Sequence, residues 1–557
     1  MSSPIPSPPN RLNVPLGREE QGRLRRIYLE TAGVVALSLV CLIPYFHLPI
    51  SDPDEGIIAC GAERILGGQV PYRDFFSELG PISFYLHALF FKLGTINITS
   101  MRLTVWLLGG ATAGLLYILA RKILRPLWAV VAATILPLVC YPTVYRVSHH
   151  WWADFFLLLT VLALSASLAC EPDQVSEPRS LWCALAGALA ATALLTMQTK
   201  GFWAILMGLL FLWTEPWFSA RREYRFRRVL FFLGGAAAVV GLMAAYFAAQ
   251  GALGAWMDAN LVFLFTNYRA YLDVPQASSI QMIIHIGGLA SRQFSVHFSL
   301  YFIGYLFFVF VAPVVALGGT AASLIATRRN PPLESTFVFL LFLQGAATFI
   351  SEFHSPDVAH LVWGSPLLLI LFVYQWEHLS VDAHTLKRPL QIAGVGVMAL
   401  VLLTAGRKAI IMSEIDGRVE TRRGVLYVSH DESTHTQAMI DAIQQRVPPG
   451  GETFFYPYMA EIYFLTATRN PTRHDVLLQD FHRPEQIAEA VANLERARPA
   501  YVFGFDRIQL LTVRPHFPDD VPDMIRPHPV GKALAAPGSG YQLESIVEDM
   551  EVWARNP

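Results

Sequence analysis

The sequence predicts a polytopic α-helical membrane protein of about eleven transmembrane helices, with a small α/β domain after the last one. Three observations carry this prediction. Hydrophobic residues make up 54% of the 557 residues and charged residues only 15%, whereas about a quarter are charged in soluble domains. Long apolar runs alternate with clusters of Lys and Arg, and no such run follows residue 405. The net charge of −1 gives no reason to expect a nucleic-acid partner.

The order of apolar runs and basic clusters predicts the topology. The first span covers residues 27–50, and three arginines precede it, so the positive-inside rule makes residues 1–26 a cytoplasmic tail. The strongest basic cluster, residues 221–228, lies on the same side, and an odd number of spans places the C-terminus outside. We expect the further spans at 101–120, 128–145, 151–169, 181–197, 202–218, 229–249, 298–325, 337–350, 361–376 and 390–405.

The chain divides into a membrane domain, residues 27–405, and an extracytoplasmic domain, residues 406–557. The first outer loop of the membrane domain, residues 51–100, contains two short apolar segments, 56–66 and 81–93. Neither is long enough to span a bilayer, so we expect both to lie at the membrane surface as interfacial helices. The extracytoplasmic domain alternates predicted strands at 424–429, 452–456 and 500–505 with helices at 434–447 and 484–496. It carries no phosphate-binding loop, and we interpret it as a lid or an acceptor-docking module.

An acidic cluster follows the first span on the outer side. Asp52, Asp54 and Glu55 surround Pro53 there, where anionic lipid would repel them. One interpretation is a solvated loop in which Asp54 caps the helix that starts near Gly56. The other is a catalytic carboxylate that awaits a substrate carried by a lipid.

The acidic pair stands in a longer pattern. Asp54-Glu55 is followed by an interfacial helix that ends in Leu66-Gly67-Gly68, by Pro81 at a second helix, and by Arg102-Leu103 at the second span. This pattern resembles the first outer loop of polytopic GT-C glycosyltransferases, the superfamily of protein O-mannosyltransferases and lipid A aminoarabinose transferases. Many relatives have Lys-Pro where this chain has Gly80-Pro81, so a basic residue that would meet the donor phosphate is absent at this position.

The resemblance implies an activity. It implies an inverting glycosyltransferase that moves a sugar from a polyprenyl-phosphate donor to an extracytoplasmic lipid, glycan or protein, in a multi-pass protein of the bacterial inner membrane. Asp54 is then the catalytic base, and Glu55 its partner or the residue that orients the acceptor. Glu78, from the same loop, could close the site. The candidates for donor-phosphate binding are Arg102, Lys200 and Arg146; Arg102 and Lys200 can equally be interfacial anchors.

The loop at 351–360 leaves several interpretations open. His354 and His360 could hydrogen-bond the substrate, bind a metal together with Glu352 and Asp357, or belong to an ordinary interfacial loop. Their spacing does not specify a metal site, so we expect no metal and no cofactor, with a divalent ion as the open alternative. We interpret His149-His150 and the following Trp151-Trp152 as a membrane-interface belt.

A transporter or flippase of lipid-linked substrates is the alternative function. Transporters place charges near the middle of the bilayer on broken helices and often contain inverted repeats. In this sequence the charges gather at the outer ends of the predicted spans and no repeat is evident. These features favour the transferase.

Overall fold

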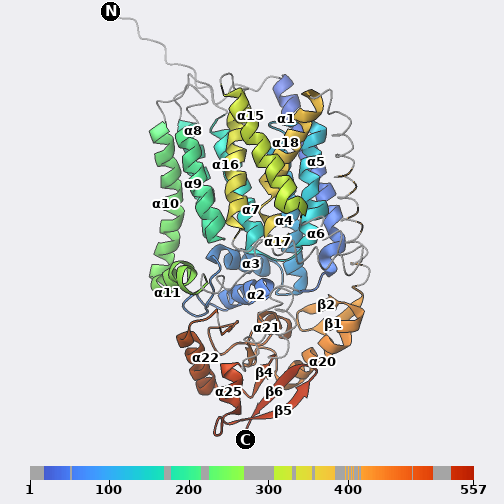
Figure 1. The fold of residues 1–557 in the computed structure, drawn as a ribbon. Coiled ribbons are helices and arrows are strands. Elements are labelled where there is room, and N and C mark those ends of the chain that lie inside the picture. The colour runs from blue at the N-terminus through green and yellow to red at the C-terminus, as the bar shows by residue number, and fades with distance from the viewer. Residues whose placement is uncertain are drawn as a thin grey trace, which may run out of the picture.

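A computed structural model of the chain gives its fold (Figure 1). Almost all of the described regular structure is helical, with the strands confined to the C-terminal part. The residues that the structure describes are 18–50, 53–168, 177–214, 225–268, 306–328, 334–353, 358–382, 415–479, 481–505 and 528–557, with single positions between 383 and 414.

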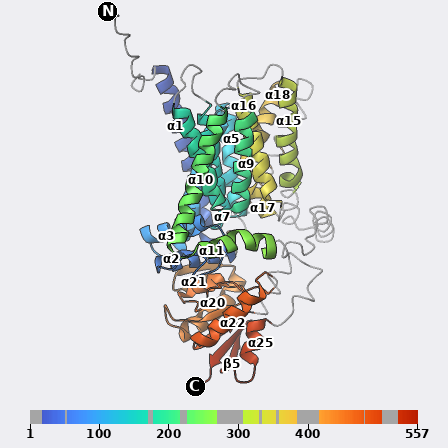
Figure 2. The same ribbon diagram turned by 90° about the vertical axis from the view of Figure 1, so that its left-hand side faces the viewer.

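The helical part is a bundle whose long helices run along one common direction (Figures 1 and 2). The start of the first described helix lies at one end of this bundle, and the C-terminal part covers the opposite end. The bundle helices are α1 (Arg18–Leu42), α4 (Ile98–Ala120), α5 (Pro126–Ile135), α6 (Tyr141–Thr143), α7 (His149–Ala166), α8 (Glu177–Leu194), α9 (Gln198–Thr214), α10 (Arg225–Ala249), α15 (Gly319–Thr327), α16 (Ser335–Ser351), α17 (Val358–Trp363) and α18 (Pro366–Asp382).

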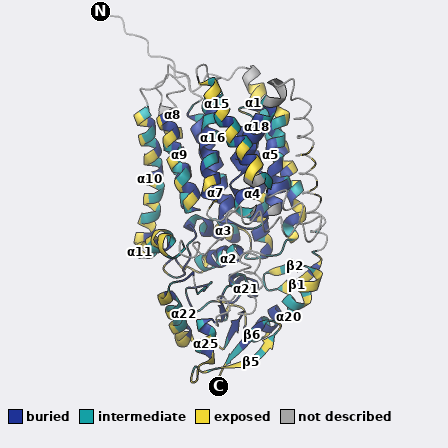
Figure 3. Cartoon of the chain, in the orientation of Figure 1, coloured by how far each residue is buried: buried dark blue, intermediate teal, exposed yellow. Residues whose placement is uncertain are grey.

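Three helices among the described residues are long and apolar enough to cross a bilayer. They cover Gln21–His47, Ile98–Ala120 and Arg225–Ala249, where the sequence predicts spans. The α10 helix exposes apolar side chains along its length, among them Leu230 and Leu242 (Figure 3). Such a surface is costly in water and suits lipid. The total of eleven spans stays a prediction, because residues 298–305 and most of 390–405 lie outside the described residues.

Prolines interrupt the α-helix in the spans predicted at 128–145 and 361–376. The span predicted at 128–145 changes at Leu136–Cys140 from α5 into a π-helical turn that contains Pro137. The span predicted at 361–376 is divided between α17 and α18, with Gly364 and Ser365 between them and Pro366 as the first residue of α18. Proline cannot donate the backbone hydrogen bond that would continue a helix, which explains both interruptions.

Two short helices cross the end of the bundle that faces the C-terminal part. They are α2 (Pro53–Leu66) and α3 (Pro81–Leu93), and they confirm the helices predicted at 56–66 and 81–93. They pack closely, because a Cβ atom on Gly61 of α2 would lie 2.5 Å from the Phe84 ring of α3. A third short helix, α11 (Leu253–Met257), lies at the same level (Figure 2).

The C-terminal part is an α/β unit with a mixed sheet. The four strands have the order β3-β4-β6-β5, in which β3 and β4 are parallel and the other pairs antiparallel. The elements are β1 (Gly417–Thr421), β2 (Gly424–Val428), α20 (His430–Arg446), β3 (Phe454–Tyr456), α21 (Ala460–Thr466), α22 (Pro484–Ala497), β4 (Tyr501–Gly504), α25 (Pro529–Ala535), β5 (Tyr541–Val547) and β6 (Met550–Arg555). All five elements predicted here are present, and sequence reasoning missed β1, β5, β6, α21 and α25.

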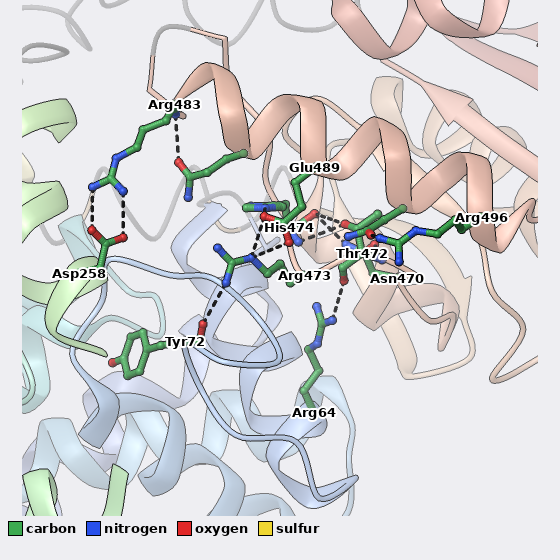
Figure 4. A network of polar contacts seen from close by, with 12 residues as sticks. Arg64, Tyr72, Asp258, Asn470, Thr472, Arg473, His474, Arg483, Glu489 and Arg496 are labelled. Carbon is green, nitrogen blue, oxygen red and sulfur yellow. Dashed lines mark hydrogen bonds and ion pairs between the residues drawn. The ribbon is translucent and has the colours of Figure 1, made fainter. Parts of the chain in front are cut away.

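Charged side chains join the C-terminal part to the end of the bundle (Figure 4). Arg64, in the last turn of α2, donates to Asp475 at 2.6 Å and to the Thr472 carbonyl at 2.8 Å. Arg483 forms a two-pronged pair with Asp258 at 2.9 and 3.0 Å. The bidentate geometry fixes orientation as well as distance, so these contacts set where the C-terminal part sits over α2.

Candidate active site

The α2 helix begins with the acidic pair and directs its two carboxylates to different surroundings. The Asp54 side chain keeps 31% of its surface exposed, and its Oδ2 lies 3.6 Å from Nδ1 of His149. The carboxylates of the first turn lie near the positive end of the helix dipole, which stabilises their charge. Asp54 therefore remains accessible at the end of the bundle.

Glu55 is fully buried and paired with Arg102, which lies in the second turn of α4. Its Oε1 accepts from Arg102 Nη1 at 2.5 Å and from the Val147 backbone N–H at 2.7 Å. Arg102 Nη2 also donates to the carbonyls of Leu48 and Pro49, at 3.1 and 3.0 Å. These bonds tie the start of α2 to α4 and to the segments that follow α1 and precede α7, so the pair orients the helix that carries Asp54.

A second buried charge centre surrounds Lys200, at the start of α9. Its ammonium lies 2.6 Å from Asp154 Oδ1 of α7 and 2.8 Å from Glu352 Oε1, at the end of α16. It also donates to the Trp363 carbonyl at 3.0 Å. The three charged side chains are buried, and the two carboxylates offset the desolvation of the ammonium.

Two histidines connect Asp54 with the Lys200 centre. The His149 and His150 rings lie 4.3 Å apart, and His150 Nδ1 lies 3.1 Å from Glu352 Oε1. The His150 ring stacks on Trp363 at 3.9 Å. Both histidines are buried, as are Trp151 and Trp152. The membrane-interface belt predicted at 149–152 is therefore wrong: this segment starts α7 inside the bundle and belongs to the site.

Arg146 lies at the same end of the bundle. Its guanidinium stands over the Trp363 ring, 4.9 Å from the centroid. The carbonyl of Trp363 accepts from Lys200, so two cations contact one residue. The face of an indole ring attracts a guanidinium ion through a cation–π interaction, so Trp363 stabilises the charge of Arg146 at this position.

The C-terminal part reaches the site through α21. A Cβ atom on Gly56 would lie 2.3 Å from the backbone nitrogen of Glu461 and 2.9 Å from the carbonyl carbon of Ala460. Cys60, one turn further along α2, donates to the Ala460 carbonyl at 3.0 Å. The start of α21 thus touches α2 just after Asp54, and only a glycine allows this approach.

Solved structures share this architecture. The Archaeoglobus fulgidus oligosaccharyltransferase in complex with Zn and sulfate is similar, with a TM-score of 0.54 and 11% identity over 94% of this chain and 73% of that one. AglB from the same organism, in complex with an inhibitory peptide and a dolichol-phosphate, gives 0.51 and 13% over 94% and 74%. ArnT from Cupriavidus metallidurans bound to undecaprenyl phosphate gives 0.51 and 14% over 96% and 98%. The chain has the GT-C fold. No protein-family model and no curated protein matches the sequence.

Within this GT-C fold the predicted site residues fall into separate groups. Asp54 and Lys200 are connected through the histidines, and His360 joins them, with its ring 5.2 Å from that of His150. Arg102 pairs with Glu55, and this ion pair neutralises its charge. His354 lies outside the described residues.

Glu78 lies beside the start of α9 in the GT-C bundle. Its backbone carbonyl accepts from the Gln198 amide at 2.8 Å, two residues before Lys200. Burial raises the pKa of the Glu78 carboxyl. A role in closing the site stays a prediction.

Asp154 is a further site residue that sequence reasoning missed. It is a single acidic residue inside the apolar run of α7, and it is 1% exposed. A carboxylate inside a predicted span is a functional candidate by default, because burying it without a partner is expensive. That signal could have identified Asp154 before the structure did.

The GT-C fold also brings together a possible set of metal ligands. His150, Glu352 and His360 each offer one ligand atom, and these atoms lie within 4.8 Å of one another. Imidazole and carboxylate are common ligands of Zn²⁺ and Mn²⁺, and Glu352 Oε2 has no hydrogen-bond partner in the described part of the chain. The other oxygen of Glu352, however, already pairs with Lys200. The group has the spacing of a metal site, but a fixed ammonium ion already occupies its only carboxylate.

Proposed function

We propose that this protein is an inverting membrane glycosyltransferase that moves a sugar from a polyprenyl-phosphate donor to an extracytoplasmic acceptor. In this reaction an acceptor hydroxyl attacks the anomeric carbon while the bond from that carbon to the phosphate oxygen breaks. The hydroxyl proton passes to Asp54, and the polyprenyl phosphate leaves as an anion. The reaction needs only the donor, the acceptor and the side chains of this protein, and no other reactant.

The observation that carries the proposal is the position of Asp54. Its carboxylate is partly exposed at the start of α2, and it lies 3.6 Å from His149, at the edge of the buried charge cluster. A general base must reach the proton that it removes. Asp54 meets this requirement better than Glu55, which is fully buried and held by Arg102 and Val147. We assign to Glu55 and Arg102 the role of positioning α2.

The leaving phosphate needs a cation, and we assign this role to Arg146, supported by Lys200. Arg146 is half-buried over Trp363, and Lys200 donates to the carbonyl of the same residue. A preorganised cation stabilises the charge that develops on a leaving group. The lipid phosphates bound to AglB and ArnT, whose fold this chain shares, support a donor of the same chemical class.

Incubating membranes that contain the protein with radiolabelled polyprenyl-phosphate sugars tests the proposal. We expect label to pass from the donor into lipid, glycan or protein in an extract that supplies acceptors. Membranes without the protein give the background. A donor that crosses the bilayer with its sugar still attached, and with no labelled product, would instead identify a flippase.

A further inference from the structure

We propose that Lys200 is a built-in cation that keeps divalent metal ions out of the His150–Glu352–His360 group. The proposal goes beyond the glycosyl-transfer function and does not depend on it, because it concerns only which cation these side chains hold. It explains why the ligand spacing of a metal site occurs together with a buried ammonium ion.

The ammonium of Lys200 has no donor left over. An ammonium group has three N–H donors, and Lys200 contacts three acceptors: Asp154 at 2.6 Å, Glu352 at 2.8 Å and the Trp363 carbonyl at 3.0 Å. These acceptors come from three separate segments, so the ammonium is enclosed on several sides. The ammonium nitrogen thus occupies the position that a metal ion bound by two carboxylates and one carbonyl oxygen would take.

The backbone that carries Lys200 is also fixed. A Cβ atom on the next residue, Gly201, would lie 2.0 Å from the Cα of Leu194, so α9 starts in direct contact with the end of α8. Lys200 is fully buried. The side chain therefore has no route by which it could swing into solvent and leave its carboxylates to a metal ion.

A divalent ion and the ammonium would share one carboxylate. A metal bound by His150, Glu352 and His360 would have to lie next to Glu352, whose Oε1 is 2.8 Å from Nζ. A metal ion and an ammonium ion that contact the same carboxylate repel each other strongly in a buried site, where mobile salt ions do not screen their charges. Metal affinity rises with the negative charge of the ligands, and Lys200 neutralises half of the charge that Asp154 and Glu352 supply.

Removing the ammonium should therefore create a metal site. Without it, two buried carboxylates and the Trp363 carbonyl would surround the place of Nζ, and His150 lies 3.1 Å from one of these carboxylates. Oxygen-rich sets of this kind bind Mn²⁺, and an added imidazole suits Zn²⁺. Asp154 Oδ2 and Glu352 Oε2 have no hydrogen-bond partner among the described residues, so each carboxylate has an oxygen to offer.

The test is metal binding by the purified full-length protein in detergent, after removal of metals with a chelator. Titration calorimetry with Zn²⁺ and with Mn²⁺ measures affinity, and elemental analysis measures content. We expect Lys200→Ala to bind at least one of the two ions at least tenfold more tightly than the unmodified protein. Arg146→Gln, which removes a nearby cation that is not on Glu352, should leave the affinity unchanged.

A second variant keeps the test decisive if Lys200→Ala does not fold. Lys200→Gln combined with Asp154→Asn removes one charge of each sign, so the buried site keeps its net charge and is easier to fold. This variant frees Glu352, the carboxylate of the metal-ligand group, from the ammonium, so it should still bind metal more tightly. Unmodified protein that purifies with one equivalent of metal, and variants that lose it, would overturn the proposal. Unchanged affinity in a folded variant would overturn it as well.

Discussion

Glu55 and Arg102 form a buried ion pair that joins α2 to α4. This pair gives Glu55 surroundings that differ from those of the adjacent Asp54. Glu55 is held from several sides, whereas its neighbour Asp54 stays partly exposed beside His149. Two residues that look alike in the sequence thus have different surroundings. The difference suggests that one is structural and the other reactive.

Asp54→Asn keeps the shape of the side chain and removes the base. We expect sugar transfer to fall by about 10²- to 10⁴-fold, the usual contribution of a general base, with the protein still folded. The measurement is the rate of label transfer from polyprenyl-phosphate sugar in membranes. Asp52→Asn, in the same cluster, is the matched control and should matter far less. Equal losses in the two variants would argue against a specific role for Asp54.

Glu55→Gln and Arg102→Met should each destabilise the fold. Breaking a buried ion pair from one side costs about 3–5 kcal/mol, because the remaining charge is left without a partner. The amide oxygen that replaces the Glu55 carboxylate can still accept from the Val147 N–H, so Glu55→Gln isolates the effect of the charge. Thermal unfolding in detergent measures the loss, and the double variant should be more stable than the sum of the two single losses predicts. Strictly additive losses would contradict the coupling.

Gly56→Ala should separate α21 from α2. The new Cβ would lie 2.3 Å from a backbone nitrogen of α21, which cannot move as a side-chain end can. We expect a loss of about 1–3 kcal/mol, typical of overpacking, and a slower transfer reaction. Limited proteolysis of the C-terminal part reports the separation. Gly241→Ala, on α10 with no atom within 4 Å of its Cβ, is the control and should be neutral.

Acid should loosen the C-terminal part. Burial lowers the pKa of His482 to about 3 and that of His528 to about 4, from an ordinary value of 6.5. Both histidines are thus neutral when folded and bind protons when unfolded. Their contribution to stability is complete above pH 6.5 and is lost as pH falls, by up to about 1.4 kcal/mol per pH unit for each histidine.

Unfolding temperatures measured between pH 7.5 and pH 5 check this prediction. They should fall steadily below pH 6.5, and His482→Gln should reduce the slope. His435→Gln, a change at a more exposed histidine of the same part, is the control. A slope that His482→Gln leaves unchanged would assign the acid sensitivity to other groups.

The sequence by itself determined the local structure at the site. The apolar runs bounded by Pro and Gly predicted both ends of α3 and the last residue of α2, because these signals act over one or two helical turns. The α2 helix starts at Pro53 and not near Gly56, so Asp54 lies in its first turn and does not precede it. The acidic pair directly after an apolar run identified Asp54 as a candidate, because this signal is also local in the sequence. The strands at 541–547 and 550–555 escaped prediction: they carry polar and charged residues on half-exposed faces, and only their pairing with each other and with β4 defines them.

Only the tertiary structure decided which charges meet. Arg102 and Lys200 have the same appearance in the sequence, as lone cations at the ends of apolar runs. One is held by Glu55, 47 positions earlier, and the other by Asp154 and Glu352 on two different segments. Side-chain periodicity shows which face of a helix is buried but not what it meets. The partner of a buried charge is set by how the helices pack, because desolvation makes any other arrangement too costly.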